Sequence, residues 1–386
     1  MISRRRGEAP PPGARLAAAV VAAAVLSGPL AAQNVQPTRL TGAPMIQPPA
    51  GEIETLQVRD HIYILLGAGG NITVSVGPDG VFMVDSGQAA MTDKVLAAVR
   101  QLQREAAARL IPRPLGWGAE TRSSAADRNT APPPKPIRYI VNTHMHADHT
   151  GGNEKLRNAG RTYTGGNVAG DIRDSGEGAA IVAHEKALLR LVQGSAGQSE
   201  PPAAALPTDT YYVDSYKLSH FFNGEGIQLF HLPRAHTDGD SIVYFRRADV
   251  IAMGDLMFTD HYPIIDIDRG GTINGIIDGL NRVLDMAIPE FRLEGGTMMV
   301  PGHGRLVDSG DVAYYRDMLT IVRDRVEDLI KKGMTLDQVR AAGPSADFDV
   351  VYGSASGEWT TDQFIEAVYE TLGGGKVATP AGRRQR

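Results

Sequence analysis

Residues 144–152, with the sequence HMHADHTGG, place three histidines and an aspartate within six positions. The chain has only 10 histidines, and imidazoles crowded beside a carboxylate gain nothing in folding unless a shared partner holds them together. Imidazole nitrogen and carboxylate oxygen are donors that proteins offer to zinc, iron and manganese. Cysteine is absent, which excludes thiolate ligands, disulfides and a thiolate nucleophile. The segment therefore predicts a metal site built from histidine and carboxylate.

Three further candidate ligands lie far along the chain, each after a run of apolar and β-branched residues. His236 follows LFHLPRA, Asp255 follows VIAMG, and His303 follows MMVPG. We expect each of them at the end of a strand, because loops at one edge of an α/β scaffold gather the residues that do chemistry. Four other histidines show no such pattern and are expected to be ordinary surface or packed residues: His61, His184, His220 and His231.

The spacing inside the first cluster suits two ions rather than one. His144 and His146 are two positions apart, so in an extended segment their side chains project to the same side. Asp148 and His149 follow one turn later and can face a second ion nearby.

Strand-like and helix-like segments alternate around these residues. We expect strands at 62–67, 72–77, 81–87, 137–144, 227–236, 241–250, 250–255 and 296–304. We expect helices at 92–106, 272–286, 311–333, 335–343 and 361–372, and a strand followed by a helix within 178–191. GAGGN at 67–71 is typical of a hairpin turn. The alternation predicts an α/β protein with helices outside its sheets.

The N-terminal region has the composition of an export signal. Residues 1–32 combine the basic start MISRRR with a short Ala-rich apolar run that ends in LAA, which indicates a cleaved signal peptide more than a membrane anchor. Residues 33–50 are predicted to be a flexible Pro-rich leader, and residues 376–386 a disordered tail. We therefore expect an exported protein, periplasmic or secreted, that has no membrane segment after cleavage.

The net charge of the chain limits the kinds of molecule that it can bind. Removal of residues 1–32 takes away four arginines and one glutamate, which changes the formal net charge from −5 to −8. An acidic exported chain is a poor binder of nucleic acid, so we expect a small-molecule substrate. The sequence leaves the oligomeric state open.

The ordered set of motifs resembles the metallo-β-lactamase superfamily. The set consists of VDSG with Asp85, the H-x-H-x-D-H run at 144–149, AHTDGDS with His236, MGD with Asp255, and PGHG with His303. The resemblance covers most of residues 52–305 and implies a four-layer αββα sandwich. We place that fold at residues 51–333 and a C-terminal helical extension at residues 334–375.

The resemblance also implies two zinc ions per chain and a role for each ligand. The residues that would hold the first ion are His144, His146 and His236. Those that would hold the second are Asp148, His149 and His303, with Asp255 bridging the two. Asp85 would lie behind the ligands and fix the loop that carries them.

A zinc site of this kind predicts hydrolysis. The metal lowers the pKa of a bound water to about 7, which gives a hydroxide that attacks a carbonyl near neutral pH. Asp148 is the candidate catalytic residue, because a carboxylate ligand keeps an oxygen that orients the nucleophile and shuttles its proton. The motif GxSxG is absent, which argues against an α/β-hydrolase.

The substrate is less constrained by the sequence. Asp255 stands where many β-lactamases of this superfamily have Cys or Ser, and a bridging Asp is more similar to glyoxalase II-type thioesterases and lactonases. We expect hydrolysis of a cyclic or activated ester or amide, with a lactone or a β-lactam first. A glyoxalase II-like thioesterase and a mononuclear-iron persulfide dioxygenase are the alternatives. Candidate substrate contacts are Asn71, His261 and Tyr262.

Overall fold

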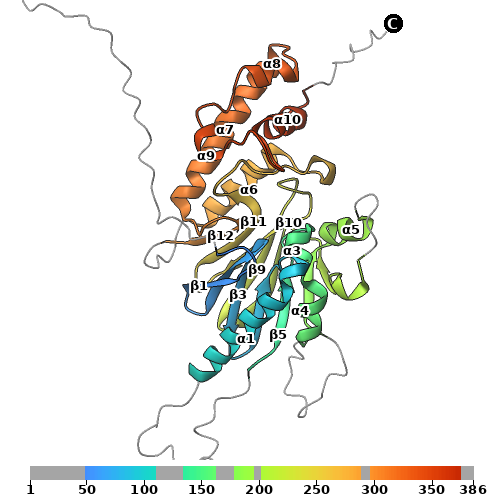
Figure 1. Ribbon diagram of the computed structural model, residues 1–386, viewed down its shortest axis with the longest axis vertical. Helices are drawn as coiled ribbons and strands as arrows, with labels where there is room; N and C mark the ends of the chain where they lie inside the picture. The colour runs from blue at the N-terminus through green and yellow to red at the C-terminus, as the bar shows by residue number, and fades with distance from the viewer. Residues whose placement is uncertain (1–47, 110–133, 162–177, 195–200, 288–295, 375–386) are drawn as a thin grey trace, which may run out of the picture. The chain divides into compact units, whose positions relative to one another are not determined.

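Two mixed β-sheets face each other and carry helices on their outer surfaces (Figure 1). The computed structural model describes residues 48–109, 134–161, 178–194, 201–287 and 296–374. The expected signal peptide, most of the leader and the C-terminal tail lie outside the described residues. Among the described residues, no helix combines the length and the apolar character that crossing a bilayer requires.

The first sheet has seven strands in chain order. Its strands are β1 (Glu54–Arg59), β2 (Ile62–Ala68), β3 (Gly70–Gly77), β4 (Gly80–Val84), β5 (Ile137–Val141), β6 (Ala180–His184) and β7 (Asp209–Tyr211). Strands β1 to β4 are antiparallel, and β4 to β7 are parallel. Ala68 pairs with Gly70 across GAGGN, which confirms the hairpin turn.

The second sheet has five strands in the order β12-β11-β10-β9-β8. Its strands are β8 (Ser215–Phe222), β9 (Glu225–Leu232), β10 (Asp240–Phe245), β11 (Val250–Phe258) and β12 (Met298–His303). Only the pair β11 and β12 is parallel. The sequence patterns did not predict β1, β7 or β8, because these strands lie at sheet edges where exposure leaves little apolar alternation.

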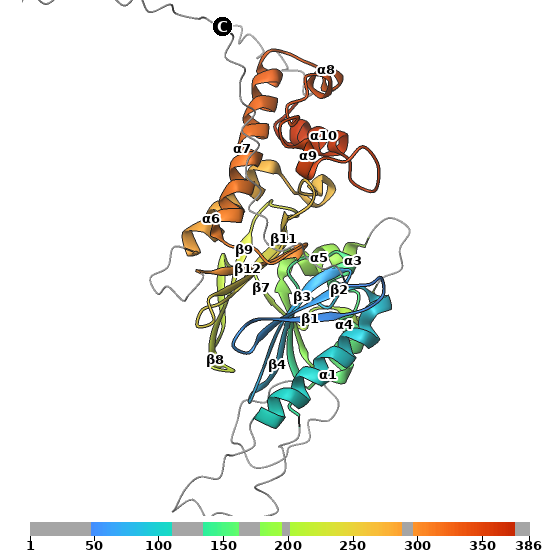
Figure 2. The same ribbon diagram turned by 60° about the vertical axis from the view of Figure 1, so that its left-hand side comes forward.

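The helices cover the outer faces of the sheets. Those on the side of the first sheet are α1 (Thr92–Arg109), α3 (Ala147–Thr150), α4 (Asn153–Ala159) and α5 (Glu185–Gln193). Those on the side of the second sheet are α6 (Ile273–Met286) and α7 (Ser309–Lys331), followed by α8 (Leu336–Ala341), α9 (Asp349–Tyr352) and α10 (Thr361–Thr371). Figure 2 shows α1 lying along the first sheet while α6 and α7 lie on the side of the second.

Strand β4 shows how the sequence builds these layers. Phe82 and Val84 point into the cluster between the two sheets, whereas Val81 and Met83 point outward to the cluster that contains Val95 of α1. A strand buried on both faces needs apolar residues at every position, which is why this stretch is continuously hydrophobic. Together the clusters define four layers, helix, sheet, sheet and helix, and confirm the predicted sandwich with extra C-terminal helices.

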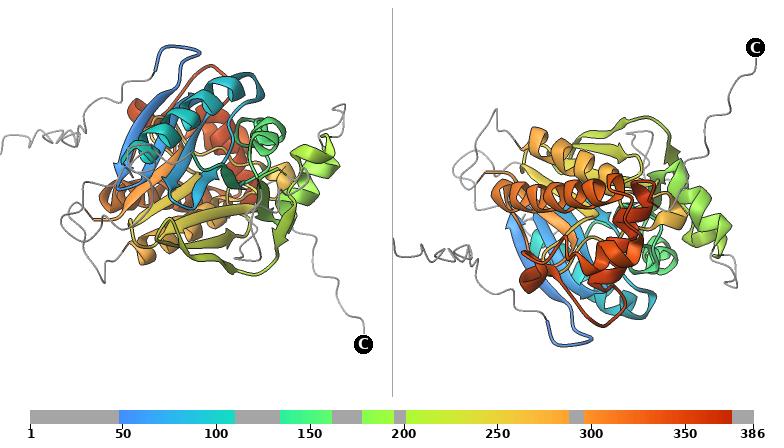
Figure 3. Two further views of the ribbon diagram at one scale, coloured as in Figure 1. Left: turned by 90° about the horizontal axis from the view of Figure 1, so that it is seen from below. Right: turned by 90° about the horizontal axis from the view of Figure 1, so that it is seen from above.

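The C-terminal helices share the hydrophobic cluster on the outer face of the second sheet (Figure 3, right). Three of its side chains are 0% exposed: Tyr315 of α7, Val339 of α8 and Phe364 of α10. Phe364 stacks on Tyr262 from the loop after β11, with ring centroids 4.3 Å apart and planes 3° apart. The helices on both sides of residue 333, where we predicted a boundary, therefore pack into one core.

Replacement of Phe364 tests this packing. Phe364→Ala should lower the free energy of unfolding by about 3 to 5 kcal/mol, because it removes a fully buried ring and leaves a cavity. Urea unfolding followed by circular dichroism measures the change. Val350→Ala is the control, because Val350 is 86% exposed and its loss should cost no more than about 0.5 kcal/mol. Equal stability of the two variants would contradict the packing of α10.

Candidate metal centre

A short turn after β5 supplies four of the seven expected ligands. His144 and His146 lie in the loop that leaves the strand, and His146 has an extended backbone (φ −67°, ψ 150°) at the start of α3. Asp148 and His149 lie in α3 itself, whose first turn is closed by a hydrogen bond from the His149 amide to the His146 carbonyl. The backbone changes from extended to helical after His146. The pair His144 and His146 therefore lies in one group of candidate ligands, and the pair Asp148 and His149 lies in a neighbouring group.

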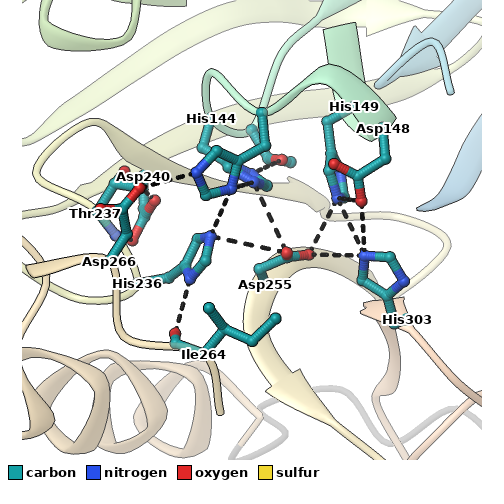
Figure 4. A network of polar contacts seen from close by, with 12 residues as sticks. His144, Asp148, His149, His236, Thr237, Asp240, Asp255, Ile264, Asp266 and His303 are labelled. Carbon is teal, nitrogen blue, oxygen red and sulfur yellow. Dashed lines mark hydrogen bonds and ion pairs between the residues drawn. The ribbon is translucent and has the colours of Figure 1, made fainter. Parts of the chain in front are cut away.

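Three imidazoles and one carboxylate form the first group (Figure 4). Nδ1 of His146 lies 3.1 Å from Nε2 of His144 and 2.9 Å from Nε2 of His236. Oδ2 of Asp255 lies 3.7 Å from each of the latter two nitrogens. These separations suit four ligands around a single small cation, since tetrahedral zinc takes nitrogen ligands at about 2.0–2.1 Å.

The outer nitrogen of each imidazole is held by an acceptor. Nε2 of His146 donates to Asp266 at 2.9 Å, and Nδ1 of His236 donates to the carbonyl of Ile264 at 2.7 Å. Nδ1 of His144 lies 3.0 Å from the hydroxyl of Thr143, and that hydroxyl gives its own hydrogen to the carboxylate of Asp85.

These acceptors lie beside the outer nitrogens, so the inner nitrogens of the three rings face one another. Inner nitrogens 2.9 and 3.1 Å apart repel one another unless a proton or a cation lies among them. The first group therefore fits a metal ion.

Two imidazoles and two carboxylates form the second group. Oδ2 of Asp148 lies 3.0 Å from Nε2 of His303 and 3.3 Å from Nε2 of His149. Oδ1 of Asp255 lies 3.1 Å from Nε2 of His149 and 3.6 Å from Nε2 of His303. Asp255 therefore turns one oxygen to each group, which is the arrangement that a bridging ligand needs.

The surroundings of Asp255 correct one expectation. It does not follow a strand but lies within β11, where the pairing with β12 shifts after Gly254. Gly254 has a φ of +54°, and a Cβ on Gly302 would lie 2.0 Å from Oδ1 of Asp255. The glycines in MGD and PGHG thus bend β11 and leave room for the carboxylate between the strands. That Oδ1 atom is buried and has no partner in hydrogen-bond geometry among the described residues, although Nε2 of His149 lies 3.1 Å away.

The pKa values of the ligands favour binding of a cation. Burial lowers the pKa of His144 well below its ordinary value and that of His236 to about 4, so both rings are neutral near pH 7. Burial opposes the ionisation of Asp255, yet His149 and His144 hold its pKa well below the usual range. Burial likewise opposes the protonation of His149, but Asp255 and other carboxylates raise its pKa well above the ordinary value. The ionised carboxylates thus require positive charge, which a metal ion can supply in place of protons.

Asp85 clamps the ligand-bearing loop from behind. Its side chain is almost fully buried, and Oδ1 accepts a hydrogen bond from the Thr143 amide at 2.7 Å. Oδ2 accepts from the Thr143 hydroxyl and from Nδ1 of His149, both at 2.8 Å. One carboxylate therefore orients His149 directly and His144 through Thr143.

The three candidate substrate contacts lie in different surroundings. Asn71 is buried, and its amide nitrogen donates to the carbonyls of Pro301 and Gly304, both at 2.9 Å, so it secures the loop around His303 instead of facing a substrate. Tyr262 is 1% exposed. Its hydroxyl donates to Asp349 at 2.8 Å, which ties the segment after α8 to the loop after β11.

His261 lines a cavity of about 1020 Å³ above both groups. Ligands from both groups also line this cavity, among them His146, Asp148, His236, Asp255 and His303. Phe258 stacks on His303 with ring centroids 5.4 Å apart, packs at a tilt against His261 with centroids 4.3 Å apart, and forms an apolar wall. Of the three candidates, only His261 thus faces the space where a substrate would meet the metal centre.

A family model for the metallo-beta-lactamase superfamily matches residues 66–303. The chain belongs to this superfamily. The match spans more than half of the chain and includes all seven candidate ligands and Asp85. No curated protein matches the chain significantly.

The fold is similar to that of a solved sulfatase structure, and two metallo-beta-lactamase structures match less closely. A double mutant of the sec-alkyl sulfatase PisA1 is 16% identical with a TM-score of 0.53, over 86% of this chain and 52% of that one. The chain thus spans about half the length of that sulfatase. The metallo-beta-lactamase DIM-1 is 14% identical with a TM-score of 0.44, over 70% of this chain and 97% of that one. The metallo-beta-lactamase from Pontibacter korlensis is 13% identical with a TM-score of 0.45, over 70% and 99%.

The four histidines expected to be ordinary residues lie outside both ligand groups. His184 and His231 stack on each other with centroids 3.6 Å apart, and His61 lies 3.5 Å from the buried Glu225. Neither these three nor the exposed His220 belongs to the two ligand groups of the described residues.

Thr143 and Asp266 are functional neighbours that sequence reasoning missed. Asp266 lies in YPIIDIDRG, 120 residues from the histidine it contacts, and no motif marks it. Thr143 directly precedes His144 and its adjacency was visible, but its link to Asp85 depends on how β4 and β5 pair.

Substitution of Asp266 tests its support of His146. Oδ2 accepts from His146 and Oδ1 accepts from the Arg269 amide, so an asparagine, with a single acceptor oxygen, can serve only one of them. Asp266→Asn should weaken zinc binding by about 10- to 100-fold, measured by competition with a chromogenic chelator. Asp268→Asn is the matched control, because Asp268 is exposed and belongs to neither ligand group of the described residues. Equal zinc affinity in the two variants would show that Asp266 does not position His146.

Proposed function

We propose that the protein is an exported zinc-dependent hydrolase that cleaves a small cyclic or activated ester or amide, with lactones and β-lactams as the first candidates. The observation that carries the proposal is the pair of His and Asp groups that share Asp255 and open into one cavity. Membership of a superfamily that consists mostly of metallo-hydrolases supports the reaction type.

The donor set favours two zinc ions. Five imidazole nitrogens and two carboxylates, without a thiolate, suit zinc, iron or manganese. Both groups are complete among the described residues, which favours a dinuclear centre over a mononuclear one. When bound, zinc supplies a Lewis acid that activates water and polarises a carbonyl oxygen.

Asp148 is suited to move the proton of the attacking water. Its side chain is 27% exposed and lines the cavity. Burial acts to raise its pKa, but hydrogen bonds from His149 and His303 keep that pKa far below the usual range, so the carboxylate is ionised. An ionised carboxylate that faces the reacting space can accept a proton from water and pass it to the leaving group.

Other side chains hold the machinery and shape the space. His146 is kept in one tautomer by Asp266, and His236 by the carbonyl of Ile264. Phe258 and Ile264 provide apolar walls that limit the water around the reacting carbonyl. The chain's own residues therefore orient, exclude water and transfer a proton, while the substrate is bound in the cavity above them.

The alternatives use the same scaffold with a different substrate or metal. A glyoxalase II-like thioesterase would use the same centre on a thioester, whereas a persulfide dioxygenase would need one iron. Export rests on the composition of residues 1–32, so sequencing the N-terminus of secreted or periplasmic protein tests it.

Metal analysis of the mature protein, purified without chelator, tests the proposal first. We expect about two zinc ions per chain and hydrolysis of at least one lactone, β-lactam or activated ester that a chelator abolishes. His146→Ala should lower both zinc content and hydrolysis, because it removes a ligand of the first group. His220→Ala is the control, since that exposed residue on β8 belongs to neither group.

Each other outcome has a clear meaning. One iron per chain would replace the hydrolase proposal with persulfide oxidation. A preference for thioesters would favour the thioesterase. Unchanged zinc content in His146→Ala would remove that residue from the site.

A further inference from the structure

Helix α5 packs against the loop after β9, which carries His236. A Cβ on Gly239 of this loop would lie 2.8 Å from the amide nitrogen of Ala187 and 3.0 Å from its Cα, so the loop and the first turn of the helix meet through their backbones. One turn further along α5, Arg190 reaches the same loop with its side chain. The helix therefore contacts the loop at two points, although none of its residues belongs to the superfamily motifs.

Arg190 and Asp238 form a bidentate ion pair. Nε of Arg190 lies 3.2 Å from Oδ1 of Asp238, and Nη2 lies 2.9 Å from Oδ2. The two side chains are 28% and 18% exposed, respectively. A bidentate pair holds two planar groups in one relative orientation, which a single contact from a lysine does not. The pair therefore fixes the position of Asp238, which lies two residues after the candidate ligand His236.

Asp238 joins three segments of the chain. Its carboxylate binds Arg190 of α5, and its carbonyl accepts a hydrogen bond from Nε2 of His231 in β9 at 2.9 Å. Its amide donates to the carbonyl of Arg269 at 2.8 Å, and the amide of Arg269 donates to the carboxylate of Asp266 at 3.1 Å. Asp238 thus links α5 and β9 to the loop after β11.

The loop after β11 contacts two ligands of the first group. Oδ2 of Asp266 accepts a hydrogen bond from Nε2 of His146 at 2.9 Å. The amide of Asp266 donates to the carbonyl of His236 at 3.0 Å. A displacement of Asp238 would therefore move both His146 and His236.

The second group is supported by other residues. Asp85 orients His149, and Asn71 secures the loop around His303. Among the described residues, the ion pair on α5 has no hydrogen bond to any of these four. The two ion sites should therefore respond differently to a change on α5.

We propose that Arg190 is a positioning residue for the first ion site. By holding Asp238, it keeps the loops after β9 and β11 in the arrangement that directs His146 and His236 to one ion. The inference rests on the proposed zinc centre. It adds a residue outside the superfamily motifs that supports one ion and not the other.

Zinc affinity of the mature protein with one ion site disabled tests the proposal. His303→Ala removes a ligand of the second group and keeps the first group intact, and His236→Ala does the reverse. In the His303→Ala protein, Arg190→Met should weaken zinc binding by about tenfold, measured by competition with a chromogenic chelator, because the support of two ligands is lost. In the His236→Ala protein, Arg190→Met should leave the zinc affinity unchanged.

Further variants separate positioning from a general effect on stability. Because the ion pair is partly exposed, its loss should cost the fold little, and thermal unfolding of metal-free Arg190→Met should match that of the wild-type protein. Arg190→Lys keeps the charge but not the bidentate contact, so its zinc affinity should lie between those of wild type and Arg190→Met. Asp238→Asn should weaken zinc binding as Arg190→Met does, and the two changes combined should add little beyond either alone.

Arg325→Met is the matched control. Arg325 of α7 also pairs with an aspartate, Asp347 at 2.7 Å, and neither residue belongs to a ligand group of the described residues. Its loss should leave the zinc affinity unchanged in both single-site proteins. Equal zinc affinities of Arg190→Met and Arg325→Met in the His303→Ala protein would overturn the proposal. An equal loss of affinity in both single-site proteins would overturn it too, because the effect would then be general.

The zinc affinities decide the role of Arg190 independently of hydrolysis. A wild-type protein that binds zinc and hydrolyses no substrate would count against the proposed function alone, whereas one that binds no zinc would overturn both proposals. Should a single-site protein fail to bind zinc, titration of the protein with both sites intact decides. There Arg190→Met should lower one zinc affinity and leave the other unchanged, and a change in both or in neither would contradict the assignment.

Discussion

The metal centre depends on the buried carboxylate of Asp85. This residue has a φ of +67°, a backbone conformation that costs energy for any residue but glycine. Its burial raises the pKa of the carboxyl against the opposing effect of His149, so the charge is expensive to keep. Three donated hydrogen bonds from Thr143 and His149 offset that cost. In return, one side chain fixes the direction of two imidazoles that point to two different ion sites.

The geometry behind this clamp comes from parallel pairing of β4 and β5. The amide of Asp85 donates to the carbonyl of Val141, so the ladder continues one residue beyond the strands and brings the VDSG turn against the loop after β5. The second sheet supplies His236, Asp255 and His303 from the same edge. Ligands from both sheets therefore meet at Asp255, and a bound cation would link the two halves of the sandwich where their hydrophobic contact ends.

The two groups of candidate ligands could be predicted from sequence because their residue types and spacing are local. Two histidines two apart, followed by Asp and His one turn later, carry their own geometry, and strand ends with glycine mark the rest. The layers were predictable for the same reason, since β4 and its neighbours are apolar on both faces. What could not be predicted depends on contacts between distant segments. Asn71 and Tyr262 looked like substrate contacts because of their positions beside motifs, yet tertiary packing turns both inward.

The candidate metal ligands and the residues that line the cavity opposite them differ in the same way. The ligands follow motifs because a metal ion tolerates few donor types and few separations, so the sequence must repeat them. The wall of the cavity opposite the ligands needs no fixed residue types or spacing, because any segment that reaches the opening can form it. Here that segment is 353–359, joined to the sandwich through the stacking of Tyr262 on Phe364 and through Asp349. The residues that line the cavity opposite the ligands therefore come from a segment outside the family motifs, so their types can change while the ligands stay the same.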